Sequence, residues 1–87
     1  EYTYLGIIGG EKDGLYRIEQ RNKFSVGETI EIMKPDGRNL SVTVKAIYNE
    51  NGESVESAPH PQQKLAVDLG TGIEKYDLLR RAEASEN

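Results

Sequence analysis

The side chains that could support acid–base, nucleophilic or metal chemistry are few in this 87-residue sequence. It contains one histidine, His60, and no cysteine. A metal centre needs several converging ligands, and a serine nucleophile needs a base close to it. His60 stands between Pro59 and Pro61, which restrict its backbone, and no nucleophile-elbow motif accompanies it. We interpret His60 as a loop residue or a contact to a partner, and we expect neither a metal site nor a cofactor.

Carboxylates and glycines add no catalytic signal. The sequence has 15 Asp and Glu residues against 11 Lys and Arg, so closely spaced acids carry little information. Gly6, Gly9 and Gly10 resemble a phosphate-binding loop, but they are not followed by the helix pattern that such a loop requires. We therefore predict that this chain is not an enzyme by itself.

The stretch EQRNKF, residues 19–24, is the strongest candidate for a binding surface. It is dense in long polar side chains and ends in the only phenylalanine of the chain. Arginine matches phosphate or carboxylate groups, and asparagine and glutamine recognise hydrogen-bonding edges. The alternative is a solvated strand exit, with Phe24 closing one end of the core. Together with the histidine loop, the candidate partner-binding residues are Gln20, Arg21, Asn22, Lys23, Phe24, His60, Gln62 and Gln63, and Arg17, Lys34, Arg38, Arg80 and Arg81 could extend them.

Alternating apolar and polar residues predict that strands carry these side chains. Successive side chains of a strand point to opposite faces, so each apolar row is expected to face inward. The longest row is Leu40, Val42, Val44, Ala46 and Tyr48, and Leu65, Val67 and Leu69 repeat the pattern. Shorter alternations surround Tyr16 and Ile30, and residues 2–8 are apolar on both faces.

Turn signals separate these runs at Asp13-Gly14, at residues 34–38, at residues 49–52 and at residues 70–72. Residues 53–63 are interpreted as a loop. Residues 73–83 fit either a helix or a closing strand through residues 78–80, and we favour the strand because it would cover an open sheet edge. We predict one all-β domain over residues 1–81, a small closed or nearly closed six-stranded antiparallel barrel, followed by a frayed tail at 82–87.

The net charge of −4 argues against strong non-specific binding of nucleic acid. No apolar run approaches the roughly 20 residues of a membrane span. The absence of cysteine suits a reducing compartment, so we expect a cytoplasmic protein without membrane contact. The sequence begins Glu1-Tyr2 without methionine or signal peptide, so we expect a piece of a longer chain that is monomeric in isolation.

Several motifs resemble known families. FSVGETIEI at residues 24–32, with residues 45–48, 65–69 and 76–80, is similar to the second domain of translation elongation factors, a six-stranded barrel. At the same positions EQRNKF (19–24), GETIE (27–31), HPQQ (60–63) and DLLR (77–80) resemble the C-terminal domain of peptidase family U32, the collagenase-like peptidases. This second resemblance runs from about Leu5 to Arg81.

The U32 resemblance implies an accessory domain that follows a larger catalytic domain, a modified eight-fold α/β barrel absent from this chain. The family is named for peptidase (hydrolase) activity, although some relatives act in hydroxylation of transfer or ribosomal RNA. It implies a non-catalytic domain that positions substrate or packs against the catalytic domain of the same parent chain. An RNA-contacting module and a peptide or protein interaction module remain the alternatives. No catalytic residue of the family maps onto this sequence.

Overall fold

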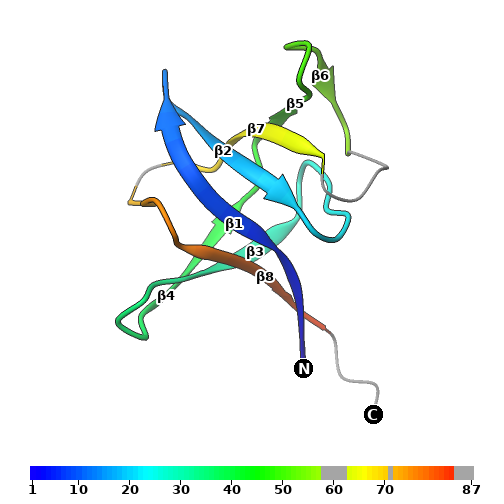
Figure 1. Ribbon diagram of the computed structural model, residues 1–87. Coiled ribbons are helices and arrows are strands. Elements are labelled where there is room, and N and C mark those ends of the chain that lie inside the picture. Colours follow the sequence, from blue (N-terminus) through cyan, green and yellow to red (C-terminus); the bar gives the residue numbers. More distant parts are fainter. Residues whose placement is uncertain (58–62, 71, 84–87) are drawn as a thin grey trace.

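The computed structural model describes residues 1–57, 63–70 and 72–83, and every helix or strand within them is a β-strand. The strands are β1 (Tyr2–Lys12), β2 (Leu15–Gln20), β3 (Thr29–Met33), β4 (Asn39–Thr43), β5 (Ala46–Tyr48), β6 (Ser54–Val55), β7 (Lys64–Asp68) and β8 (Leu78–Ala82). They form one antiparallel sheet in the order β4-β3-β8-β1-β2-β7-β5-β6 (Figure 1). The all-β prediction is confirmed, and so is the strand favoured at residues 78–80. Within the described ranges no helix is long and apolar enough to cross a membrane.

The first hairpin forms as its turn residues predict. The pairing between β1 and β2 ends with Lys12 opposite Leu15, so the loop between the strands has two residues, Asp13 and Gly14. Both loop residues have positive φ, 56° and 83°. This is the conformation of a type I′ turn, whose twist matches that of the paired strands. The Asp-Gly pair therefore fixes this hairpin locally.

The last strand lies inside the sheet. β8 pairs with β1 on one side and with β3 on the other, so that Arg80 lies opposite both Tyr4 and Glu31. The expectation that a closing strand would cover the edge of a meander is therefore wrong. The first and last strands are neighbours, and Leu79 is completely buried at the centre of the sheet.

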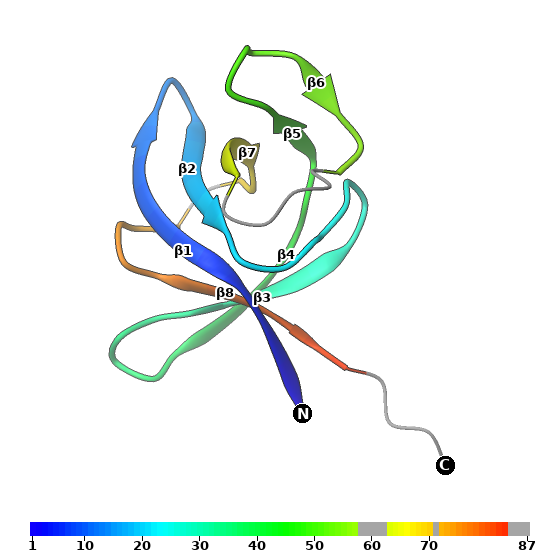
Figure 2. The ribbon, with the colours of Figure 1, turned by 45° about the vertical axis from the view of Figure 1, so that its right-hand side comes forward.

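The segment from Asn39 to Tyr48 connects β4, at one edge of the sheet, to β5, which lies next to the other edge (Figure 2). Its first half pairs with β3, and the Val44 amide still donates to the Glu28 carbonyl at 2.9 Å. At the next residue the Lys45 amide donates instead to the Asp68 carbonyl, and pairing continues between β5 and β7. The strand thus changes partners between residues 44 and 45.

This change of partner overturns the predicted inward row. Val44 and Ile47 are completely buried, whereas Leu40 is 37% exposed. A shift of one residue in a strand moves its side chains to the opposite face. The predicted six-stranded barrel is also not confirmed, because the described strands number eight and β4 and β6 remain the two edges of an open sheet.

The concave side of the curled sheet encloses one apolar core. Its buried members come from most of the strands and from the segments between them. They are Leu5, Ile8, Tyr16, Ile18, Phe24, Ile30, Ile32, Val44, Ile47, Leu65, Val67, Leu69, Ile73 and Leu79.

Candidate functional site

The EQRNKF segment is split between the interior and the surface. Phe24 is completely buried and Gln20 is 1% exposed. The Gln20 amide donates to the Gln63 carbonyl at 2.9 Å, so these two candidate residues are brought together. His60 and Gln62 lie outside the described residues. The position of Phe24 agrees with its interpretation as a residue that closes the core.

Arg21, Asn22 and Lys23 are exposed, but the fold holds this segment in place. The Arg21 guanidinium pairs with Glu19 at 3.0 Å. The Asn22 side-chain amide donates to the main-chain oxygen of Tyr4 at 2.7 Å. The Lys23 carbonyl accepts a hydrogen bond from Arg81 at 3.3 Å. These contacts tie the segment to β1 and β8. Of its two cations, Arg21 forms an ion pair, and Lys23 forms none within the described ranges.

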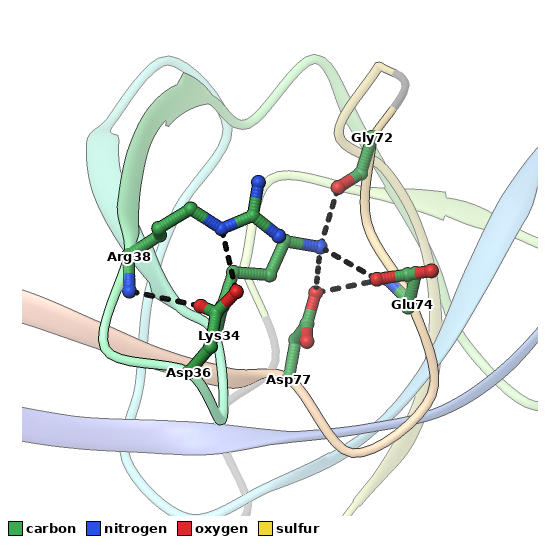
Figure 3. Close-up of polar contacts among 6 residues, drawn as sticks. All are labelled: Lys34, Asp36, Arg38, Gly72, Glu74 and Asp77. Atoms are coloured by element: carbon green, nitrogen blue, oxygen red, sulfur yellow. Dashed lines mark hydrogen bonds and ion pairs between the residues drawn. The ribbon is translucent and has the colours of Figure 1, made fainter.

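A buried cluster around Lys34, which the sequence patterns did not indicate, is shown in Figure 3. The Lys34 ammonium donates to Asp77 Oδ2 at 2.5 Å, to the Gly72 carbonyl at 2.6 Å and to Glu74 Oε1 at 3.4 Å. The side chains of Lys34 and Asp77 are only 5% and 1% exposed. Asp77 Oδ2 also accepts the Glu74 amide at 2.9 Å.

The cluster joins the turn after β3 to the segment before β8. The hydrogen bond to Asp77 raises the pKa of Lys34, which therefore stays protonated at neutral pH. A lysine in this state cannot act as a base or nucleophile. Lys34 and Asp77 are 43 residues apart in sequence, so no local pattern pointed to the pair.

Two arginines expected to extend a basic patch are neutralised by carboxylates. Arg80 Nε lies 2.8 Å from Glu31 Oε1. Arg81 pairs with Glu28 at 2.8 Å and with Glu83 at 3.1 Å. The hydrogen bond to Glu28 raises the pKa of Arg81. With Lys34 buried as well, these residues form no continuous basic surface around the EQRNKF segment.

A shallow groove of roughly 650 Å³ lies over β1, β2 and β7, beside the turn that follows β5. Its floor includes Ile7, Gly9 and Ala66, and its rim carries the exposed Arg17 and Lys64. Neither cation forms an ion pair within the described residues. No local pattern relates Arg17 to Lys64, because the β2–β7 pairing brings them to one groove, with Arg17 opposite Ala66 and Lys64 opposite Glu19.

Nothing in the described part of the chain resembles a catalytic centre. No group of three or more histidine, aspartate or glutamate side chains could hold a metal ion there. Lys34 and Asp77 are a buried ionisable pair among the described residues, and the pair links the turn after β3 to the segment before β8. The residues that line the groove include no nucleophile with an adjacent base.

Comparison with known proteins identifies the family. Residues 1–80 match the model described as the peptidase family U32 C-terminal domain. The chain belongs to this family. The U32 C-terminal domain is similar to the tRNA hydroxylation protein P1 of Bacillus subtilis, with 26% identity over 84 residues, and to the tRNA hydroxylation protein P of Escherichia coli, with 33% identity over 85 residues. The two alignments cover 94% and 95% of this chain, but the chain spans only 20% and 18% of the length of the two curated relatives.

Solved structures agree with this assignment. Two crystal structures of the C-terminal domain of a Geobacillus thermoleovorans protein, assigned to the U32 peptidases, superpose with TM-scores of 0.80 and 0.79. Both are 25% identical to this chain, and they cover 91% and 93% of it. The alignment takes in 99% of the first crystallised chain, so a domain of this fold stands as a separate structural unit.

Proposed function

We propose that this U32 C-terminal domain is a non-catalytic accessory domain that positions the substrate of a larger protein. The observation that carries the proposal is the Lys34–Asp77 cluster, in which the buried charges neutralise each other and serve the fold. The groove over β1, β2 and β7 supplies a surface for binding without groups for catalysis. Chemistry then belongs to the remainder of the parent protein, whether that parent is a peptidase, as the family name says, or modifies RNA.

The test compares the full-length protein with a version that lacks this domain, on protein and on RNA substrates. Loss of positioning predicts a raised KM with kcat largely retained at saturating substrate. If kcat instead falls to background at saturating substrate, the domain takes part in the catalytic step itself. Turnover of casein or collagen by the isolated chain would refute the non-catalytic role directly.

Direct contact with RNA is the second candidate, supported by the groove and by the names of the two relatives, which refer to tRNA hydroxylation. Arg17 and Lys64 are unpaired cations on the rim of one groove, and they are suited to phosphate oxygens. The exposed Gly9 on the floor leaves room for a ligand to approach the backbone.

If the groove contacts RNA, the double variant Arg17→Ala with Lys64→Ala should weaken tRNA binding. The slope of the logarithm of the binding constant against the logarithm of the salt concentration should also become shallower by about 2, because two phosphate contacts are lost. Lys12→Ala is the matched control, because Lys12 is exposed at the first hairpin and lies outside the groove. Equal losses in the control and the double variant, or no binding at low salt, would exclude this groove as an RNA site.

A further inference from the structure

The outer side of β1, β8 and β3 carries two exposed tyrosines. Tyr2 and Tyr4 are 55% and 41% exposed, and they stand two residues apart on β1, so their rings lie on the same side of the strand. Arg80 is opposite Tyr4 in the β1–β8 pairing, and its guanidinium lies 3.5 Å from the centroid of the Tyr2 ring. We name the tyrosine face by its members, Tyr2, Tyr4, Ile7, Glu31, Met33, Leu78 and Arg80.

Aliphatic side chains extend the tyrosines into a larger apolar surface. Ile7, Leu78 and Met33 lie opposite one another across three adjacent strands, and each is only partly buried. Leu78 shares its side of β8 with Arg80, two residues away, and Arg80 lies beside Tyr4. Exposed contiguous apolar surface of this kind marks sites of interaction with other macromolecules.

The charges on the tyrosine face favour a protein partner over a nucleic acid. Glu31 holds the Arg80 guanidinium at 2.8 Å, and the same guanidinium stacks on Tyr2. The neighbouring Arg81 is matched by Glu28 and Glu83. None of these cations is left without a carboxylate partner, so the tyrosine face offers little attraction to a polyanion. Tyrosine and arginine are both enriched at protein interfaces.

We propose that the tyrosine face docks onto the larger, preceding part of the same protein. The chain spans only 20% and 18% of its two relatives, and the family model describes it as a C-terminal domain, so most of such a protein precedes it. A preceding part would join the chain at its N-terminus, at the start of β1 (Figure 1), and β1 is the strand that contains Tyr2 and Tyr4. The inference rests on the proposed accessory role and adds the surface through which the domain is held.

The experiment is hydroxyl-radical footprinting of the tyrosines in the isolated domain and in the full-length protein. We expect the oxidation rates of Tyr2 and Tyr4 to fall about five-fold or more in the full-length protein, because side chains at an interface core lose contact with solvent. Tyr76 is the internal control, since it is 63% exposed, belongs to the turn before β8 and is not on the tyrosine face. Its rate should stay the same.

Unchanged rates for Tyr2 and Tyr4 in the full-length protein would overturn the proposal. So would protection that appears only after tRNA is added, which assigns the face to RNA, or protection that is lost on dilution, which assigns it to a second copy. The double variant Tyr2→Ala with Tyr4→Ala should speed proteolytic release of the domain from the full-length protein, while Tyr76→Ala should not. The KM comparison above is a separate measurement, so protection with unchanged KM would refute substrate positioning and leave the docking intact.

Discussion

Replacing Lys34 with methionine tests the central structural claim, that the Lys34–Asp77 pair serves the fold. The substitution removes the ammonium that donates to Asp77, Gly72 and Glu74 while keeping a side chain of similar length. Asp77 would stay 1% exposed with the Glu74 amide as its remaining donor to Oδ2 within the described residues. A buried carboxylate that loses its cation is strongly destabilising.

Breaking a buried pair by removing one partner costs about 3–5 kcal/mol. An 87-residue domain is stabilised by roughly 4–13 kcal/mol in total, at about 0.05–0.15 kcal/mol per residue. Lys34→Met should therefore remove about a quarter or more of the free energy of unfolding. The double variant Lys34→Met with Asp77→Leu should recover most of the loss, because replacing both charges with apolar groups is often close to neutral.

Urea denaturation of the isolated domain measures these free energies in a double-mutant cycle. The matched control is Arg38→Met in the same turn, because Arg38 pairs with Asp36 at 2.8 Å with both side chains more than half exposed. An exposed pair of this kind contributes about 0–1 kcal/mol. If Lys34→Met costs no more than Arg38→Met, or if the cycle shows no coupling, the reasoning about this cluster is refuted.

The same pair predicts a stability change at alkaline pH. The pKa of Lys34 is raised above its usual 10.5 in the folded state, mainly by the hydrogen bond to Asp77. The folded protein then binds the proton more tightly than the unfolded chain does, so the contribution is complete below about pH 10.5 and is lost as the pH rises through the folded pKa. The difference in stability between the wild type and Lys34→Met should shrink over that range, and a constant difference would contradict the assignment.

Three further predictions concern single positions. A Cβ at Gly6 would lie 2.7 Å from a main-chain oxygen of β2, so Gly6→Ala should cost about 1–3 kcal/mol in urea denaturation, whereas Gly9→Ala, with its nearest contact at 3.6 Å, should be nearly neutral. Tyr76 has a φ of 76°, so Tyr76→Asn should raise the unfolding free energy by about 0.5 kcal/mol, and a loss would show that the ring makes a stabilising contact. The hydrogen bond from the Thr3 hydroxyl, and after it the one from Arg81, lowers the pKa of Glu83. The contribution of Glu83 to stability is therefore complete above its usual pKa of 4.5 and is lost as the pH falls through the folded pKa. Thr3→Val should raise the Glu83 pKa in an NMR titration, and an unchanged value would exclude the Thr3 contact.

The sequence by itself determined the features that depend on a few neighbouring residues. Asp13-Gly14 specified the first hairpin because both positions favour positive φ, and alternation predicted β-structure around Tyr16, Ile30 and Leu65. The motifs at residues 19–24 and 77–80 indicated the U32 C-terminal family, which the match over residues 1–80 confirms. The shortage of catalytic groups was likewise visible in the composition.

The tertiary structure alone decided which distant segments meet. The pairing of β8 with both β1 and β3 placed Arg80 against Tyr2, and the change of partner at Val44 and Lys45 turned Ile47 into the core. Lys34 reached Asp77 across 43 residues by the same kind of long-range packing. Turn and strand preferences arise from steric effects within a few residues, whereas strand order depends on how the entire apolar surface is buried at once. The groove and the tyrosine face lie where several strands come together, so neither could be predicted from local patterns.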